Sequence, residues 1–330
     1  MITGKKILIT GGAGFIGSHL ADAFLSCGNR VVALDNFSTG HRSNLVKASD
    51  HPNFTLIEGD IRDLDMCRTA AEGCDYILHE AAVGTVPLPV ENHVETVAVN
   101  VSGFVNVLTA AKDLGIRRVV YASSSSVYGD NPDPEKVEER TGVPITPYAV
   151  TKVCDELLAG QFAQLYGTQV IGLRYFNVFG PRQDSEGPAA AVIPRFIKAM
   201  RAHEYPVIYG DGASSRDFTY VANVINANVI NANILALEAG DTAVNQVYNI
   251  ACGESTTLNR LFLILRDILA EEDPFIAHLD PNYEPARLLD ISDSQASIRK
   301  AVDLLNFFPS YKLEIALRIM TRTHSTGVAY

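Results

Sequence analysis

The sequence predicts an α/β protein built around a doubly wound, parallel β-sheet. Short apolar runs alternate with stretches of helical spacing through the first half of the chain. The first run is followed at once by the glycine-rich turn GGAGFIG and then by a helical pattern. Strands separated by helices in this way pair in parallel. We expect this sheet in residues 1–175 and a smaller α/β domain in residues 176–330, with the chain crossing back over about 215–250.

The first strand, helix and turn have the order of a dinucleotide-binding unit. The apolar run Lys5–Thr10 is the expected strand, and three glycines follow it. Gly11 permits a tight turn, Gly14 lets a pyrophosphate approach the backbone, and Gly17 lets the helix pack closely on the strand. The free N–H groups at the start of the helix then face the diphosphate. The sequence therefore predicts a Rossmann-type domain that binds a dinucleotide.

The second strand, Asn29–Leu34, ends at an acidic residue that selects the cofactor. Asp35 lies about twenty residues beyond the glycines, where a carboxylate accepts hydrogen bonds from both adenosine ribose hydroxyls. The same carboxylate repels a 2′-phosphate, which favours NAD over NADP. Asp35 could instead cap a turn, and the neighbouring Arg42 keeps NADP open as an alternative.

Polar residues at the ends of later strands are candidates for the chemistry, because ligands bind at the carboxyl ends of parallel strands. The motif HEAA follows one strand, and four serines in SSSSVYGD follow another. A serine run is more often a plain loop, and a strand histidine is more often a packed residue. The expected strands are Asn53–Glu58, Asp75–His79 and Arg118–Ala122. One helix is expected to begin near Gly59, and a second, long helix is expected over Glu91–Leu114.

A tyrosine and a lysine four residues apart are the candidate proton-transfer pair. On a helix, Tyr148 and Lys152 share one face, so the ammonium can favour the ionised phenol. A free tyrosine has a pKa near 10, so a base at pH 7 needs a depression of about three units. By itself the pair could also be a solvated helix face. The glycine turn, Asp35 and the serines argue for the catalytic interpretation.

Composition and charge exclude several classes of protein. The chain is 47% hydrophobic and 20% charged, with a net charge of −11, which argues against nucleic acid or an anionic membrane as a partner. Its five cysteines have no metal-like spacing, so we expect no metal site and reduced thiols. No uninterrupted apolar run reaches about eighteen residues. A cytoplasmic protein is expected.

The motifs together resemble the extended short-chain dehydrogenase/reductases, and within them the nucleotide-sugar 4-epimerases. TGGAGFIG, LDNFSTG, HEAA, SSSSVYG and YAVTK occur in the family's order, followed by LRYFNVFGPRQ, AAVIPRFI and GDGASSRDFTYV. The likeness runs from about residue 4 to about residue 320 and is strongest to bacterial UDP-N-acetylglucosamine 4-epimerases. It implies NAD as cofactor and a UDP-sugar as substrate, and a homodimer formed through helices around Glu91–Leu114 and Thr151–Tyr166. The apolar faces of these helices could instead be ordinary core.

The resemblance assigns roles residue by residue. It implies that Tyr148 is the base and acid, with Lys152 as its electrostatic partner and Ser124 as the catalytic hydroxyl. The implied cofactor residues are Gly11, Gly14, Phe15, Ile16, Asp35, Asn36, Ser38, Gly40, Asp60, Ile61, Ala81, Ala82, Asn100, Tyr148, Lys152 and Tyr175. The implied substrate residues are Val86, Ser124, Ser125, Ser126, Tyr148, Asn177, Ala191, Val192, Tyr209, Arg216, Arg287, Asp290 and Ser294.

The implied reaction is C4 epimerisation through a transient 4-keto sugar. Dehydration is disfavoured, because the related dehydratases carry Asp-Glu where this chain has Ser125 and Ser126. The expected substrates are UDP-GlcNAc and UDP-GalNAc, with UDP-glucose and UDP-galactose as a further pair. UDP-glucuronate 4-epimerase is the nearest competing activity. A plain NAD-dependent oxidoreductase and a catalytically silent NAD-binding or nucleotide-sugar-binding regulator also stay open.

Substrate size and three departures from the family pattern bear on this interpretation. Ser294 falls where epimerases restricted to UDP-glucose and UDP-galactose carry Tyr, which leaves room for an acetamido group. Leu289 replaces a glycine of the RxGD segment, and the loop after Val86 lacks an expected Arg-Ser. The pentapeptide VINAN occurs twice, at Val224–Asn228 and Val229–Asn233, without a functional explanation from the sequence. Five added helical residues rotate the remainder of a helix by roughly 140°.

Overall fold

The protein is built on a parallel sheet of seven strands, in the order β12-β7-β5-β4-β1-β2-β3. The computed structural model describes residues 2–84, 92–184, 191–225, 232–286 and 293–325. Parallel pairing from a central strand outward in both directions is the doubly wound fold that the sequence predicts. The strands are β1 Lys6–Thr10, β2 Arg30–Asp35, β3 Phe54–Glu58, β4 Tyr76–His79, β5 Arg118–Ser124, β7 Gln169–Tyr175 and β12 Gln246–Ile250.

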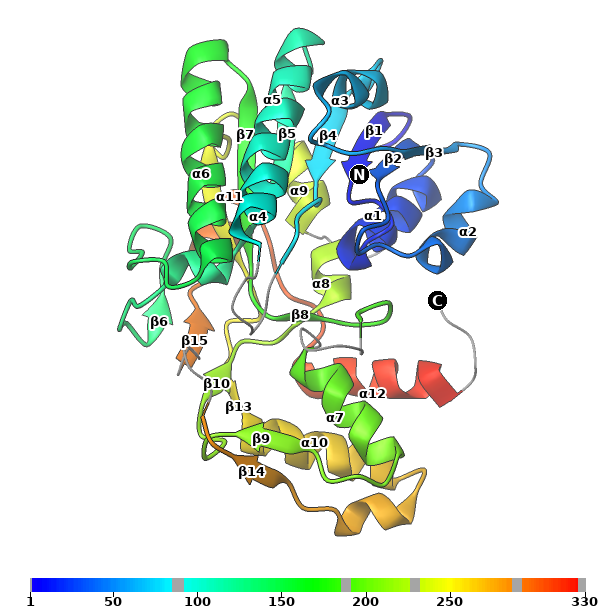
Figure 1. The fold of residues 1–330 in the computed structure, drawn as a ribbon, viewed down its shortest axis with the longest axis vertical. Helices are drawn as coiled ribbons and strands as arrows, with labels where there is room; N and C mark the ends of the chain where they lie inside the picture. Colours follow the sequence, from blue (N-terminus) through cyan, green and yellow to red (C-terminus); the bar gives the residue numbers. More distant parts are fainter. Residues whose placement is uncertain (1, 85–91, 185–190, 226–231, 287–292, 326–330) are drawn as a thin grey trace.

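Successive strand residues are buried alternately in two hydrophobic cores, one on each face of the sheet. Ile7 and Ile9 belong to one buried cluster, whereas Leu8 belongs to the other, as the period of two in a strand requires. Over one face, α5 packs between α3 and α6, and α1 contacts α8 (Figure 1). Their bounds are α1 Phe15–Ser26, α2 Val46–Ser49, α3 Leu64–Ala71, α4 His93–Val97, α5 Gly103–Asp113, α6 Pro147–Tyr166, α8 Val221–Ile225 and α9 Ala232–Glu238.

The second half of the chain forms a smaller layer of short strands and helices below the carboxyl ends of the main sheet (Figure 1). A four-stranded sheet has the order β13-β10-β15-β6, in which β6 comes from the first half of the chain, and β11-β8 and β14-β9 are two-stranded. Strand β12 returns to the main sheet beside β7. The elements are β6 Glu135–Lys136, β8 Val178–Phe179, α7 Val192–Arg201, β9 Val207–Tyr209, β10 Ser215–Arg216, β11 Thr219–Tyr220, β13 Thr256–Thr257, α10 Leu258–Ala270, β14 Asn282–Glu284, β15 Asp293–Ala296, α11 Arg299–Leu305 and α12 Leu313–Ser325.

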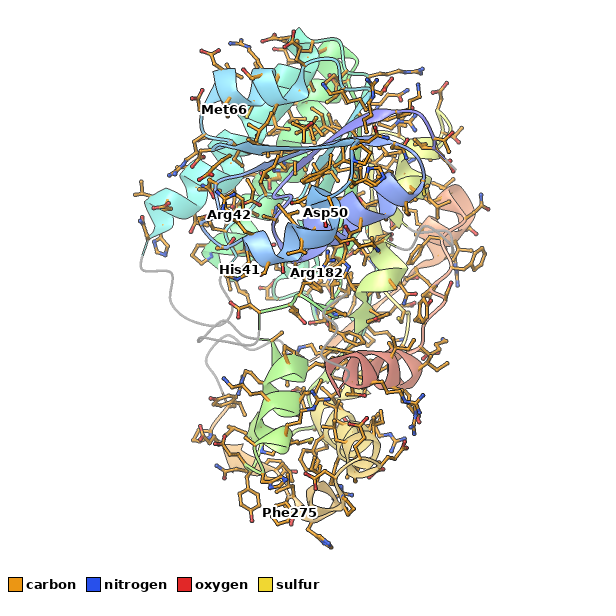
Figure 2. All side chains as sticks on the ribbon, turned by 90° about the vertical axis from the view of Figure 1, so that its right-hand side faces the viewer. His41, Arg42, Asp50, Met66, Arg182 and Phe275 are labelled. Atoms are coloured by element: carbon orange, nitrogen blue, oxygen red, sulfur yellow. The ribbon has the colours of Figure 1, made fainter. Side chains whose placement is uncertain are left out.

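One ion pair ties α1 to the segment that follows β8. Arg182 donates to Asp22 at 2.6 Å, and both side chains are largely buried. His19 lies one turn before Asp22 and contacts the Pro181 carbonyl at 3.0 Å, and burial lowers its pKa to about 4. Figure 2 shows Arg182 below α1 and α2, where the second half of the chain meets the first.

The expected helix over Glu91–Leu114 is interrupted by a π-helical turn. The turn covers Ala98–Ser102 and separates α4 from α5. The stretch His93–Asp113 contains no long uninterrupted apolar run, but its length and mean hydropathy would allow it to cross a membrane. Half of its most apolar window is buried inside the protein. Residues 226–231, within the repeated pentapeptides, lie outside the described residues, so the effect of the duplication on the helix is not described.

Candidate active site

A cavity of about 1610 Å³ opens where the strands of the main sheet end and the second half of the chain begins to cover them. Such an edge is where open α/β sheets bind ligands. Its walls include most of the residues predicted from the sequence: Gly11, Gly14, Phe15, Ile16, Asp35, Asn36, Ser38, Asp60, Ile61, Ala81, Ala82, Ser124, Ser125, Ser126, Tyr148, Lys152, Tyr175, Asn177, Ala191, Val192, Tyr209 and Arg216. Val86, Arg287 and Asp290 lie outside the described residues.

The glycine turn leaves an open cradle beside the first helix. Gly11 has φ +66°, and a Cβ there would meet the Ala81 backbone nitrogen at 2.7 Å. A Cβ on Gly17 would lie 2.1 Å from the Gly11 carbonyl oxygen. Gly14 is the N-cap of α1, which has neither a side-chain cap nor an acidic residue in its first turn. The N–H groups and the dipole of α1 can therefore bind a diphosphate.

Asp35 is held rigidly at the end of β2. Its Oδ2 accepts a hydrogen bond from Ala13 N and its Oδ1 accepts one from Phe37 N, each at 2.8 Å. Each carboxylate oxygen keeps a lone pair that can accept a ribose hydroxyl. Arg42 pairs with Glu58 and lies over the Phe37 ring, 4.2 Å from its centroid, so its charge already has partners. The available lone pairs of Asp35 and the paired charge of Arg42 therefore fit NAD.

Two predicted cofactor residues support the cavity from behind and do not line it. A Cβ on Gly40 would come within 2.9 Å of Asp35 Oδ1, so the glycine lets the chain pass close to that carboxylate. Asn100 is fully buried: its Oδ1 accepts from Val83 N at 2.8 Å, and its Nδ2 donates to Thr151 Oγ1 at 3.0 Å. Asn100 therefore links the segment after β4 to α6, and its predicted place near the cofactor stays a prediction.

The Tyr148 and Lys152 side chains meet the cavity from the first turns of α6. The Lys152 ammonium lies 5.9 Å from the centroid of the Tyr148 ring. It donates to the Ala122 carbonyl at 2.9 Å and to Asp155 at 3.2 Å, and Lys152 is 1% exposed. Burial alone would lower the pKa of Lys152, but Asp155, Tyr148 and Glu80 raise it above its usual value. The ammonium therefore stays charged beside the phenol.

Ser124 is the last residue of β5 and carries the candidate catalytic hydroxyl. Its Oγ accepts a hydrogen bond from Ser126 N at 3.1 Å, which leaves its own proton free to donate. Ser126 also lines the cavity, and among the described residues its buried Oγ has no hydrogen-bond partner. Both hydroxyls can therefore bind a polar ligand.

A buried ion pair that was not predicted from the sequence holds the end of β5 against α6. Arg174 on β7 makes two hydrogen bonds of 2.8 Å to the Glu156 carboxylate. Ser123 donates to the same carboxylate at 2.5 Å. The signal was present, because Glu156 lies one turn after Lys152 and a charged residue interrupts the apolar run of β7.

Ser294 does not line the cavity and instead supports a residue that does. Asn177, with φ +38°, donates from Nδ2 to Ser294 Oγ at 3.2 Å and to the Asp217 carbonyl at 3.1 Å. In this structure Ser294 reaches the cavity wall through Asn177, and its predicted role beside the sugar stays a prediction. Arg195, which was not predicted from the sequence, lines the cavity with its guanidinium 5.5 Å from the Tyr209 ring centroid.

Glu80, the second residue of HEAA, is an unpredicted carboxyl group on the cavity wall. It accepts a hydrogen bond from Tyr175 Oη at 3.1 Å. Burial raises the pKa of Glu80 to about 8, against the opposite effects of Tyr175 and Lys152. Its neighbour His79 bonds Thr10 at 2.8 Å, and burial lowers its pKa to about 3, so that histidine is neutral. Among the described residues, no cluster of side chains could hold a metal ion.

The fold and the cavity define a dinucleotide-dependent enzyme of the α/β class. The sequence model of the NAD dependent epimerase/dehydratase family matches residues 7–251. The chain belongs to this family, and its cofactor is NAD.

Three known proteins show how close the relationship is. A UDP-N-acetylglucosamine 4-epimerase from Methanobrevibacter ruminantium M1, solved with UDP-N-acetylmuramic acid, is 40% identical, with a TM-score of 0.90 over 99% of this chain and 100% of that chain. A putative UDP-glucose 4-epimerase of Methanocaldococcus jannaschii is 37% identical over 79% of this chain and 81% of its own length. A UDP-glucuronic acid 4-epimerase of Bacillus cereus, solved with UDP-glucuronic acid and NAD, is 28% identical, with a TM-score of 0.87 over 98% of this chain and 100% of that chain.

Proposed function

We propose that this NAD-dependent UDP-sugar 4-epimerase interconverts UDP-GlcNAc and UDP-GalNAc, with UDP-glucose and UDP-galactose as a second, smaller pair of substrates. The contact between Asn177 and Ser294 carries the proposal, because it shows a small side chain behind the cavity wall. The 40% identity to a UDP-N-acetylglucosamine 4-epimerase supports it.

The cofactor is held by the first half of the chain. In the proposed complex, the turn at Gly11 and Gly14 and the start of α1 bind the pyrophosphate, while Asp35 binds the adenosine ribose. Lys152 is proposed to reach the nicotinamide ribose. Bound NAD supplies a hydride acceptor that returns the hydride to the sugar within the same cycle.

The proton chemistry belongs to three side chains. Tyr148 takes the proton from the C4 hydroxyl and later returns it to the C4 oxygen, while the Lys152 charge stabilises the phenolate. Ser124 donates a hydrogen bond to the same oxygen. Ser125 and Ser126 cannot act as the extra acid and base of a dehydration, so the reaction ends as an epimerisation.

The nucleotide part of the substrate is proposed to bind under the second half of the chain. Arg216 lines this part of the cavity together with Ala191, Val192 and Tyr209. A guanidinium can clamp a diphosphate by charge-assisted hydrogen bonds, even on an acidic protein. Holding the nucleotide firmly leaves the sugar to turn, so that either face of C4 can meet the cofactor.

Substitution of Ser294 tests the substrate. A tyrosine at this position has to displace Asn177 toward the cavity, since the two side chains are in contact. We expect Ser294→Tyr to reduce kcat/KM for UDP-GlcNAc by about 10- to 100-fold more than for UDP-glucose. Ser294→Ala is the control, because it removes the hydroxyl and keeps the space. Equal losses on both substrate pairs would contradict the proposed size selection.

A direct assay separates the competing activities. Incubation of the enzyme with UDP-GlcNAc, UDP-glucose or UDP-glucuronate, followed by resolution of the C4 epimers, identifies the preferred sugar. Conversion of UDP-glucuronate alone would instead support the 28% identical UDP-glucuronic acid 4-epimerase as the guide to substrate. Net NADH production would indicate a plain oxidoreductase. Retained nicotinamide without any conversion of the sugars would indicate a catalytically silent regulator that binds NAD or a nucleotide sugar.

We further propose that two copies pair through the outer helices of the main sheet. Val150, Leu157 and Leu165 on α6 are exposed, and Leu157 is 70% exposed. Val94 and Val97 on the neighbouring α4 are exposed as well. Apolar residues that share a surface in this way are typical of an interface between subunits. The cytoplasmic location and the lack of nucleic-acid and membrane partners stay predictions from the sequence.

A further inference from the structure

The repeated pentapeptide contributes two groups to one buried contact near the cofactor cavity. Val224 begins the first VINAN copy and Asn233 ends the second. Asn233 Nδ2 donates to the Val224 carbonyl at 3.3 Å and to the Tyr175 hydroxyl at 2.9 Å, and Asn233 is fully buried. The two copies thus meet at the Asn233 amide, which also contacts Tyr175, the last residue of β7.

Val224, Asn233, Tyr175 and Glu80 form a hydrogen-bond chain, and the donor and acceptor in each bond follow from the chemistry of the groups. A backbone carbonyl can only accept, so Val224 fixes the NH₂ group of the Asn233 amide toward both partners. The Tyr175 oxygen therefore accepts from Asn233, and its proton is directed to Glu80 Oε1 at 3.1 Å. A hydrogen bond donated to a carboxyl oxygen favours the ionised form of that group.

Glu80 is the last group in this series of hydrogen bonds. It lines the same cavity as Tyr148, Lys152 and Tyr175. Its other oxygen, Oε2, has no hydrogen-bond partner within the described ranges. Lys152 on α6 is the charged side chain that lowers the pKa of Glu80. His79, which precedes Glu80 in sequence, is neutral. A positively charged ring beside this carboxyl group would also favour its ionised form. Burial holds the pKa of Glu80 at about 8, so at pH 7 the group becomes mainly a carboxylate only when such a positively charged ring lowers that pKa.

We propose that Glu80, held by Tyr175 and Asn233, makes the site prefer the oxidised cofactor over the reduced one. The nicotinamide ring carries a positive charge when oxidised and none when reduced, so a nearby carboxylate stabilises only the oxidised form. An enzyme that regenerates its cofactor in every cycle gains from this preference, since the hydride is then returned to the sugar. The proposal rests on NAD binding and not on which sugar is used.

Competition between the two cofactor forms tests the role of Glu80. Purified enzyme is equilibrated with mixtures of NAD and NADH of known ratio and desalted rapidly, and the retained cofactors are extracted and quantified. We expect Glu80→Gln, which keeps the size and removes the charge, to raise the retained NADH-to-NAD ratio roughly tenfold. Glu204→Gln, at an exposed position in the second half, is the control. An unchanged ratio in Glu80→Gln would overturn the proposal.

Two further variants test the hydrogen-bond chain. Tyr175→Phe and Asn233→Leu should each raise the same ratio by about threefold, and the double variant should do no more than the stronger single one. Neither should alter the ratio further in the Glu80→Gln background. If Asn233→Leu does not fold, Tyr175→Phe still decides the outcome. A folded Tyr175→Phe enzyme with the wild-type ratio would refute the role of the chain, whatever sugar the enzyme epimerises.

Discussion

The charge of a single buried lysine is the central feature at the residue scale. Lys152 is buried away from water, which opposes its charged form, but its ammonium donates hydrogen bonds to a carboxylate and a carbonyl. Burial raises the pKa of Asp155 to about 6, and Lys152 opposes that rise. The Lys152 ammonium also lies 5.9 Å from the centroid of the Tyr148 ring. The lysine charge is therefore fixed in place before any ligand binds.

Removal of the Tyr148 hydroxyl should separate catalysis from binding. Because Tyr148→Phe loses the group that moves the proton but keeps the ring beside Lys152, we expect kcat to fall by about 10²- to 10⁴-fold. Turnover is measured by resolving the C4 epimers, and bound nicotinamide is measured by absorbance. The retained NAD should equal that of the wild type. Near-normal epimerisation by Tyr148→Phe would exclude this residue as the base.

At the scale of the element, the start of α6 sets the position of the catalytic pair. Thr146 is the N-cap and its Oγ1 accepts from Ala149 N at 3.1 Å. Pro147 follows in the first turn, where its fixed φ suits a helix and its missing N–H costs nothing. The helix ends at Gly167 in the left-handed conformation. Both ends of α6 are thus defined by local chemistry, and Tyr148 lies two residues after the cap.

Loss of the cap should weaken the helix in the turn that carries the catalytic tyrosine. We expect Thr146→Ala to lower the free energy of unfolding by about 1 kcal/mol, as for other N-cap replacements. Urea unfolding measures the change. Thr146→Ser retains a hydroxyl acceptor and should stay within about 0.5 kcal/mol of the wild type. Should both variants lose the same stability, the methyl group and not the cap would be responsible.

At the scale of the whole molecule, one buried carboxylate joins segments that are far apart in the sequence. Asp217 is fully buried and accepts hydrogen bonds from Cys252 N and Gly253 N at 2.9 Å and from Ala296 N at 3.3 Å. Burial raises its pKa to about 6, although these hydrogen bonds lower it. The carbonyl of the same residue accepts from Asn177. Asp217 therefore connects the cavity wall to the short sheet below.

The titration of Asp217 predicts a pH-dependent stability. Its folded pKa lies above the ordinary value of 3.8, so the folded state binds the proton more tightly than the unfolded state does. The stability from this group is present below about pH 4 and is lost as the pH rises through about 6. We expect the free energy of unfolding of the wild type, relative to Asp217→Asn, to fall by about 2 kcal/mol between pH 4 and pH 7. Urea unfolding at several pH values measures this, and a constant difference would contradict it.

The proposed pairing of two copies is also a property of the whole molecule. We expect the wild type to have the mass of a dimer by light scattering at micromolar concentration, and Leu157→Glu to have that of a monomer, because the charge would be buried in the interface. Val46→Glu places the same charge on an exposed valine of α2, away from α6, and serves as the control. A monomeric wild type would disprove the pairing.

The sequence by itself determined the first five strands of the main sheet, most of the helices between them, the glycine turn and the position of Asp35, but not the π-helical turn Ala98–Ser102. These features depend on residues close together in the chain, such as the spacing from Gly11 to Gly17 or from Tyr148 to Lys152, so pattern and local geometry suffice. It also indicated the family and its cofactor through motifs in a fixed order.

Only the tertiary structure decided which side chains face the cavity. The hydrogen bonds of Asn100 to Val83 and of Ser294 to Asn177 could not be predicted from the sequence, since Ser294 is 117 residues away from Asn177 in sequence. The contacts of Glu80 on the cavity wall, and of Arg174 and Asn233 behind it, were not predicted, because their partners come from other strands and helices. Periodicity along the chain states which residues are buried together, whereas the pairing of individual polar atoms depends on how distant elements pack.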